Sequence, residues 1–485
     1  MHPNIFLLDD STIVQVFDEA LQILQTVGVK VLNSDAQALL VGANANLDSD
    51  NSIVRLPKDL VLRCLETAPH EFYLYDANQN PIVHYGGNTV HFDPGSSGIT
   101  VLDPDTLTHR DSTSTDLVRI IKIVEGLNAY DAQSTSVFCN EIPTKIQDIY
   151  RLFLVLLYSQ KPIVTGALSN QSIQHMIDML AIMSGGYDSL YRFPRAVFDV
   201  CPAPPLVWSN FAGGNLIALA KAGVPAEMVS VPLAGAASPV TLIGTVTQHT
   251  AECLAGLVIH QLASPGAPLV WGGAPTIFEM RRGGAPMGTI ETAMLNSACS
   301  QVGKSLGLPT HGYLGGSDSK LVDVQAGLEG GVAFLVAALS GINMVSGAGM
   351  IDSLLCVSPE KLVIDAEGIA MARRFLAGIS FPTDTYATQF YEKVNFKGGD
   401  FLKQRITINL FQKEQNVPGP VVDRNSMRDW QASGRTNAFQ RAKIEADKLV
   451  SNYQSPVLDS KKRNQLINFV SKLAKEHDLN ILPGT

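Results

Sequence analysis

Short apolar runs alternate with longer amphipathic stretches along most of the chain. Eight such runs begin 32 to 41 residues apart, and a stretch with the 3.6-residue period of a helix follows each one. Glycine comes directly after several of these stretches, at Gly223, Gly307, Gly341 and Gly378, as is typical of helix C-termini. The eight predicted strands are Thr89–Phe92, Ala129–Ser134, Ile163–Gly166, Ala196–Val200, Met228–Val231, Leu269–Trp271, Thr310–Tyr313 and Asn343–Ser346.

This alternation predicts the fold class. A strand followed by a helix, eight times over, indicates parallel βα units, and eight of them close a (β/α)8 TIM barrel. A doubly wound open sheet is the alternative, but no G-x-G-x-x-G follows a strand at the right place. We therefore expect an α/β protein with a barrel over residues 88–380, between an N-terminal helical and β extension (1–87) and a C-terminal helical extension (381–485).

The C-terminal extension differs in composition from the barrel region. Residues 381–485 hold 27 charged side chains, whereas the twice longer stretch 161–380 holds only 25. Two amphipathic helices are predicted near Ala438–Val450 and Ser460–His477. We expect this segment to act as a scaffold or in self-association, and a symmetric homo-oligomer is the default expectation.

Composition and charge exclude several classes of protein. Of the 485 residues, 46% are hydrophobic and the net charge is −9, so neither a disordered chain nor a charge-driven nucleic-acid binder is expected. Between Met228 and Phe278 only Glu252 carries a charge. Prolines and glycines interrupt every long apolar window there, which favours buried parallel strands over a membrane span.

Cysteine usage and the N-terminus indicate a cytoplasmic protein. The six cysteines form no C-x-x-C pair, so a disulfide framework is not expected. The first residues include Asp9 and Asp10 and lack the basic region of a secretory signal.

Candidate chemistry is expected where barrel strands end and βα loops begin. The loop after the seventh strand is the most informative, because Gly315 and Gly316 allow a close backbone approach and Asp318 and Lys320 follow in an apolar region. For Phe92 and Trp271, packing of the barrel is as good an explanation as binding of a cation. For Arg281 and Arg282, a pair of solvated loop charges is as good an explanation as a functional role. A Schiff-base role for Lys320 in an aldolase-like barrel ranks last.

Several segments resemble, in order, the trimethylamine methyltransferase family. The similarity extends over almost the whole chain, and together the segments are specific although each alone is weak. They are Leu308–Gly327, Ala236–Thr245, Glu252–Gly256, Pro265–Pro268, Gly347–Ile351, Glu360–Asp365 and Tyr453–Pro456.

The resemblance implies a corrinoid-dependent methyltransferase on a (β/α)8 barrel. The trimethylamine enzymes carry pyrrolysine in the strand-seven loop, where this chain has the standard residues Gly315, Gly316, Ser317 and Asp318. The chain therefore looks like the non-pyrrolysine branch, which demethylates quaternary amines. Glycine betaine is the expected substrate. Proline betaine and carnitine are alternatives, as is a non-catalytic quaternary-amine binding protein.

A quaternary ammonium leaves as a neutral amine, so we expect no acid–base or covalent catalytic residue and no metal site. Aromatic faces suit the cation, and a guanidinium suits a carboxylate. No D-x-H-x-x-G signature is present, so cobalamin is expected on a separate corrinoid protein rather than bound by this chain. The expected substrate-binding residues are Phe92, Trp271, Phe278, Arg281, Arg282, His311, Tyr313, Asp318 and Lys320.

Overall fold

The computed structural model of the protein describes residues 3–379, 387–394 and 400–485. Within these residues, eight parallel strands form two sheets, in the orders β15-β13-β11-β10-β9 and β17-β18-β6. Each strand overlaps a run predicted from the sequence. The strands are β6 (His91–Pro94), β9 (Gln133–Ser134), β10 (Ile163–Gly166), β11 (Ala196–Val200), β13 (Ala226–Ser230), β15 (Leu269–Gly273), β17 (His311–Tyr313) and β18 (Met344–Ala348).

The two sheets meet at both of their edges. On one side, a parallel bridge pairs Trp271 of β15 with Thr310, directly before β17. On the other side, the Asp131 N–H, two residues before β9, donates to the Phe92 carbonyl of β6 over 2.9 Å.

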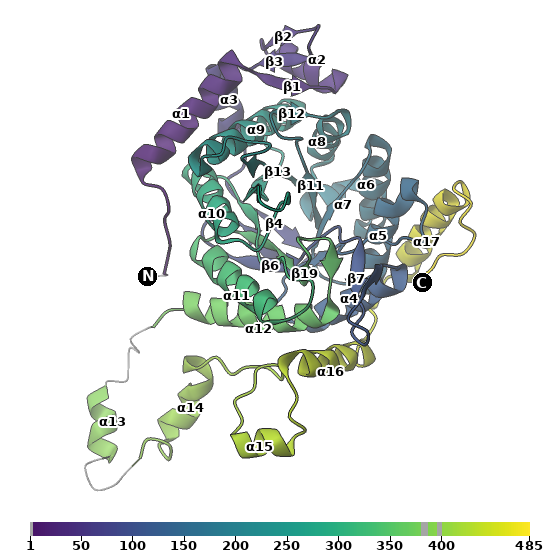
Figure 1. Ribbon diagram of the computed structural model, residues 1–485. Helices are drawn as coiled ribbons and strands as arrows, with labels where there is room; N and C mark the ends of the chain where they lie inside the picture. The colour runs from purple at the N-terminus through teal and green to yellow at the C-terminus, as the bar shows by residue number, and fades with distance from the viewer. Residues whose placement is uncertain (1–2, 380–386, 395–399) are drawn as a thin grey trace.

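A long α-helix follows each of these strands, which confirms the mixed α/β fold. Figure 1 shows the eight helices arranged around the strands. They are α4 (Ser114–Gly126), α5 (Gln147–Tyr158), α6 (Asn170–Ser184), α8 (Asn210–Ala222), α9 (Leu242–Ala263), α10 (Ile290–Ser305), α11 (Val324–Leu339) and α12 (Pro359–Leu376). By length and composition α9 could cross a membrane, but most of it is buried inside the protein.

Shorter elements lie in the connections. A small sheet of order β19-β20-β7-β8 brings the chain after β18 beside the chain after β6, and β14 pairs with β16. These elements are β7 (Thr100–Leu102), β8 (His109–Asp111), η1 (Thr144–Ile146), α7 (Tyr187–Arg192), β12 (Val207–Trp208), β14 (Leu233–Ala234), β16 (Thr276–Ile277), β19 (Met350–Ile351) and β20 (Cys356–Val357).

The N-terminal region packs directly on the strand-and-helix body. Helix α1 contacts α9, and β1 pairs in parallel with β12. The hairpin β4–β5 places Leu74, Val83 and Tyr85 in one buried cluster with side chains of the parallel strands, so residues 1–87 contribute to the interior of the body. The elements are α1 (Asp10–Thr26), β1 (Val29–Val31), α2 (Ser34–Gly42), β2 (Asn46–Asp48), β3 (Ile53–Arg55), α3 (Lys58–Thr67), β4 (Phe72–Tyr75) and β5 (Pro81–Tyr85).

The C-terminal region is helical, as its pattern predicts. Helix α16 packs on α12 and α4, and α17 packs on α6 and α5. Helices α13 to α15 stand away from the body (Figure 1). The boundary predicted at residue 380 lies outside the described residues. The helices are α13 (Ala387–Val394), α14 (Arg405–Glu414), α15 (Met427–Ala432), α16 (Ala438–Ser451) and α17 (Ser460–Lys475).

Candidate functional site

The inward-facing side of the two sheets changes from apolar to polar along the strands. Near the N-terminal ends of the strands, Val164, Val197, Val270 and Met344 form an apolar layer with the β4–β5 hairpin. Successive side chains of a strand point to opposite faces, so the residues two positions further along also point inward. A polar layer therefore lies above the apolar one. It contains Asp93, Asp199, Glu227, His311 and Ser346.

The polar layer is connected around His311. Its Nδ1 lies 3.1 Å from Glu227 Oε1, and its Nε2 lies 3.1 Å from Ser346 Oγ. The Ser346 hydroxyl donates to Asp93 Oδ1 over 2.6 Å. Tyr85 of the hairpin donates its phenol to Glu227 Oε2 over 3.2 Å. Three other chain segments, β5, β17 and β18, therefore hold the Glu227 and Asp93 carboxyl groups in place.

Burial sets the protonation states of this layer, because it disfavours every charged form. It raises the pKa of Asp93 and of Glu227 well above the ordinary values, and it raises the pKa of Asp199 to about 7. Burial lowers the pKa of His311 to about 3, so the imidazole is neutral at pH 7. Burial therefore favours the protonated forms of Asp93 and Glu227, and Asp199 is near its titration midpoint at neutral pH.

The polar layer is open to solvent on one side. Gly166 and Asp199 come two positions after the inward-facing Val164 and Val197, and Cys201 comes two positions after Asp199, so all three belong to the inward-facing side. Even so, Gly166 and Asp199 are only half-buried and Cys201 is exposed. Gly166 is the register partner of Asp199, and it has no side chain to cover the carboxyl group. Solvent therefore reaches Asp199 from the C-terminal ends of the strands, where barrel enzymes hold their active sites.

Tyr313 lies one layer above His311 on the same face of β17. Its hydroxyl accepts from the Ser96 N–H over 2.6 Å, and its ring belongs to a buried cluster with Val229, Ala274 and Met287. The two predicted site residues of β17, His311 and Tyr313, therefore both point inward, with ring centroids 6.2 Å apart.

The strand-seven loop is packed firmly against its surroundings. Gly315 has φ of +104°, and a Cβ there would lie 2.2 Å from the Phe334 ring. Ser317 donates its hydroxyl to Glu329 Oε2 over 2.5 Å. The Asp318 carboxylate accepts from Met287 N (2.7 Å) and Gly288 N (3.0 Å) and from the Ser353 hydroxyl. Asp318 therefore joins three loops, and its oxygens are already bonded.

Four of the predicted residues line one pocket above this loop, with a volume of about 490 Å³. They are Arg281, Arg282, Asp318 and Lys320. The Arg281 guanidinium forms two bonds to Glu279, of 2.9 and 2.8 Å, and thereby lowers the pKa of that carboxyl to about 2. Lys320 pairs with Asp352 at 3.3 Å. Over the part of the chain that the structure describes, the Arg282 guanidinium has no hydrogen bond or ion pair.

Phe92 and Trp271 face the surrounding helices instead of the interior. Phe92 packs edge-on against Phe334 of α11, with ring centroids 6.0 Å apart. Trp271 donates its indole N–H to the Cys299 carbonyl of α10 over 3.0 Å and packs edge-on against His249 of α9. Both are fully buried in these positions. Phe278 is half-buried and comes directly after β16.

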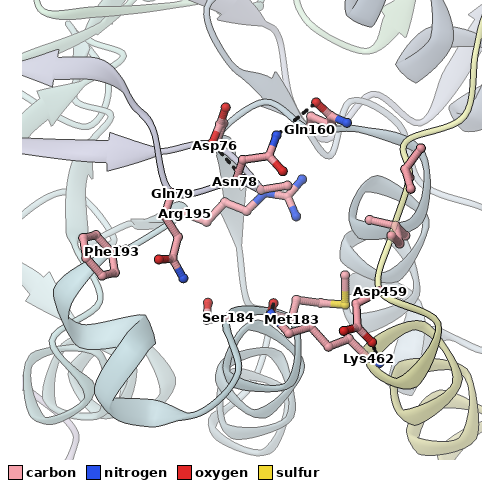
Figure 2. Close-up of a pocket in the computed structure, with 13 residues that line it drawn as sticks. Asp76, Asn78, Gln79, Gln160, Met183, Ser184, Phe193, Arg195, Asp459 and Lys462 are labelled. Atoms are coloured by element: carbon pink, nitrogen blue, oxygen red, sulfur yellow. Dashed lines mark hydrogen bonds between the residues drawn. The ribbon is translucent and has the colours of Figure 1, made fainter.

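The structure also shows a pocket of about 270 Å³ at the opposite end of the strands (Figure 2). Its charged residues have partners within the protein. Arg195, directly before β11, donates to the Ser159 carbonyl, and Lys462 donates to the Met183 carbonyl. Asp76 accepts from Asn78 N. This pocket lies at the N-terminal ends of the strands, away from the end at which βα folds hold their reactive groups.

Asp199 and Glu227 are not among the site residues predicted from the sequence. The available signal was a single acidic residue inside an otherwise apolar strand, in Ala196–Val200 and Ala226–Ser230. Such a residue is unexpected in a doubly buried strand unless it faces a polar interior. In the described residues, no three His, Cys, Asp or Glu side chains are arranged to hold a metal ion.

Known proteins of similar sequence align with nearly the full length of this chain. A trimethylamine methyltransferase MttB of Desulfitobacterium hafniense is 27% identical over 468 residues, which is 96% of this chain and 94% of that protein. A glycine betaine methyltransferase of the same species is 28% identical over 476 residues, 98% of each chain. The trimethylamine methyltransferase MttB2 of Methanosarcina mazei is 30% identical over 448 residues, 91% of this chain and 89% of that protein.

Two further comparisons concern a solved structure and a family model. The crystal structure of the Methanosarcina barkeri monomethylamine methyltransferase covers 97% of this chain and 92% of its own, with a TM-score of 0.46 and 12% identity. The family model described as trimethylamine methyltransferase (MTTB) matches residues 1–478. The chain therefore belongs to the trimethylamine methyltransferase (MTTB) family and is a methyltransferase of that family.

Proposed function

We propose that this protein transfers a methyl group from a quaternary amine, first of all glycine betaine, to Co(I) of a corrinoid carried by a separate protein. Dimethylglycine would be the other product. Family membership supports the methyl transfer. The 98% mutual coverage with a protein named glycine betaine methyltransferase supports the choice of substrate, at 28% identity.

The proposal includes a closed (β/α)8 barrel. The bridge between Trp271 and Thr310 and the bond from Asp131 N to the Phe92 carbonyl join the two sheets at both edges, which supports closure. The polar layer and the pocket near Arg282 would then lie at the C-terminal end of the barrel, the end used for catalysis in this fold.

The observation that carries the proposal is the strand-seven loop. Gly315 and Gly316 have no room for a side chain, Ser317 is bonded to Glu329, and Asp318 joins three loops. The loop therefore offers no group to activate an amine. A quaternary ammonium needs none, because its nitrogen already carries the positive charge that makes it a leaving group.

The chemistry that follows is a direct displacement. The methyl carbon accepts the electron pair of Co(I), the C–N bond breaks, and its electrons return to nitrogen, which leaves as a neutral tertiary amine. No proton is transferred. The chain must bind the substrate, align the methyl group and exclude water. Tyr313 and the polar layer would contact the substrate from within, and Arg282 is placed to reach a carboxylate from the mouth.

The formation of methylcobalamin from cob(I)alamin tests the proposal. The full chain would be incubated without oxygen with glycine betaine and cob(I)alamin, both free and bound to a corrinoid protein, with proline betaine, carnitine and trimethylamine in parallel. We expect methylcobalamin by absorbance and dimethylglycine by mass spectrometry from glycine betaine, and no product from trimethylamine. Product from trimethylamine alone, or from none of the amines, would refute the proposal; betaine binding without turnover would identify a binding protein instead.

We further expect the protein to be a homo-oligomer in the cytoplasm.

A further inference from the structure

Three inward-facing residues lie in one row across neighbouring strands. Gly166 of β10 is the register partner of Asp199 of β11, and Asp199 is the register partner of Glu227 of β13. Burial, followed by the neighbouring Asp199 carboxyl group, raises the pKa of Glu227, so the proton of this pair is favoured on Glu227. Gly166 leaves the space beside Asp199 open. Asp199 is half-buried whereas Glu227 is fully buried, so Asp199 is the member of the carboxyl pair nearer to solvent.

Two carboxyl oxygens of the polar layer lack hydrogen-bond donors within the described residues. They are Asp93 Oδ2 and Asp199 Oδ1, whereas Glu227 Oε1 lies 3.1 Å from His311 Nδ1. Asp93 and Glu227 are themselves 0% exposed. Buried polar atoms without partners are rare, and each one in a folded protein calls for an explanation. A trimethylammonium group matches such oxygens well, because it carries positive charge but has no N–H to donate.

We propose that Asp199, supported by Glu227, is the counter-charge for the trimethylammonium group of the substrate. The identity of the cation rests on the proposed function. The role of Asp199 is one of binding: the carboxylate would lie beside the cation and select it over a neutral group of the same shape. Neither residue would exchange a methyl group or form a covalent bond.

The other titratable and charged groups around Asp199 do not compete with it as the counter-charge for the cation. Tyr85 on β5 and Asp93 on β6 face Glu227, and His311 on β17 is neutral at pH 7. Cys201 follows on the same strand. Arg151 of α5 is the nearby cation, held by the Thr135 carbonyl at 3.0 Å and by the Phe138 ring. A bound cation would therefore stabilise the ionised form of Asp199.

This coupling makes binding depend on pH. Burial holds the pKa of Asp199 at about 7, so the free protein carries a proton there at pH 6 and has largely lost it at pH 8. Cation binding at pH 6 must displace that proton, whereas binding at pH 8 does not. The affinity for a quaternary ammonium should therefore rise with pH over this range, and binding at pH 6 should release protons to the buffer.

Isothermal titration calorimetry of the full chain tests the proposal with three probes. Glycine betaine and tetramethylammonium carry the cation, and 3,3-dimethylbutanoate has the shape of glycine betaine with a neutral carbon in place of nitrogen. We expect wild type at pH 8 to bind glycine betaine at least about tenfold more tightly than 3,3-dimethylbutanoate. In Asp199→Asn this preference should fall below about threefold, and the rise in affinity from pH 6 to pH 8 should disappear.

Glu252→Gln is the matched control. Glu252 is also a buried carboxyl near the end of β13 with a raised pKa, but it accepts from Leu206 N at 2.8 Å and from the Ser230 hydroxyl and lies outside the row. Its substitution should preserve the preference. Thermal unfolding of each variant checks folding, and Asn is close in size to Asp.

An unchanged preference in a folded Asp199→Asn would overturn the inference, as would failure of wild type to bind either quaternary ammonium. The proposed function has its own readout. Methyl transfer together with an unchanged preference in Asp199→Asn would overturn the inference and leave the function standing. A cation preference that depends on Asp199, without methyl transfer to cob(I)alamin, would support the inference and refute the function.

Discussion

Asp199 and Glu227 are register partners on β11 and β13, and burial together with the neighbouring Asp199 carboxyl group raises the pKa of Glu227. Two adjacent carboxyl groups in a low-dielectric interior cannot both ionise at ordinary pH, so one of them keeps its proton. The pair therefore links protonation to stability as well as to binding.

Asp199→Asn should change the pH dependence of stability. The pKa of Asp199 is about 7 in the folded state against an ordinary 3.8, so the folded state holds this proton more tightly. The resulting stability is fully present below pH 3.8 and is lost as pH rises through 7, by up to about 1.4 kcal/mol per pH unit. The variant should therefore gain in stability relative to wild type from pH 4.5 to pH 8.

Thermal unfolding of both proteins across this range measures the difference. The neutral His311 acts in the opposite direction, because it resists protonation as pH falls below 6.5, but it is present in both proteins and cancels in the comparison. A difference between the two melting temperatures that stays constant with pH would contradict the prediction.

Gly315→Ala should destabilise the strand-seven loop. The residue has φ of +104°, and the new Cβ would lie 2.2 Å from the Phe334 ring. Backbone strain and overpacking together should lower the free energy of unfolding by about 2–4 kcal/mol. Gly327→Ala in α11 is the control, because a Cβ there meets nothing within 4 Å; this helical position should gain up to about 1 kcal/mol. Urea denaturation compares them, and equal losses would refute the steric explanation.

Lys361→Met should destabilise the protein strongly. Lys361 Nζ lies 2.6 Å from Asp365 Oδ2 and 2.9 Å from the Gly315 carbonyl, and both side chains of the ion pair are buried. Removing one partner leaves a buried carboxylate without its counter-charge and should cost about 3–5 kcal/mol.

The double variant Lys361→Met/Asp365→Asn should lose less than the sum of the two single variants, because no uncompensated charge remains. The exposed pair of Lys58 and Asp18, 3.3 Å apart, provides the comparison. Lys58→Met should change the free energy of unfolding by less than about 1 kcal/mol. Additive losses in the double variant would show that the two buried groups act independently.

Arg282→Ala should weaken the binding of carboxylated quaternary amines in particular. Among the described residues lining the pocket, its guanidinium is free to pair, whereas Arg281 is already bonded to Glu279. We expect a loss of about 0.5–1.5 kcal/mol for glycine betaine at an exposed site such as this, and none for tetramethylammonium. Isothermal titration calorimetry measures the binding of both ligands, glycine betaine and tetramethylammonium, with Arg281→Ala as the control variant. Equal effects of the two substitutions would place the carboxylate elsewhere.

Local sequence pattern determined the α/β class and the eight strand positions. Parallel strands buried on both faces require apolar runs such as Ile163–Gly166 and Ala196–Val200, and helices between them require the 3.6-residue period, so both leave a mark in the sequence itself. The family could also be predicted, because the similar segments, Leu308–Gly327 among them, are specific when taken together. That His311 and Tyr313 share one face of their strand follows from their spacing of two residues.

Only the tertiary structure decided which side chains share the interior. Phe92 and Trp271 lie in the predicted strands, yet they face the helices, because the side on which a strand is packed depends on its neighbours and not on its own residues. Asp199 and Glu227 are 28 positions apart and meet through strand register, and Tyr85 joins them from a hairpin in the N-terminal region. Contacts of this kind depend on how distant segments pair, and the local pattern of a single strand does not contain that information.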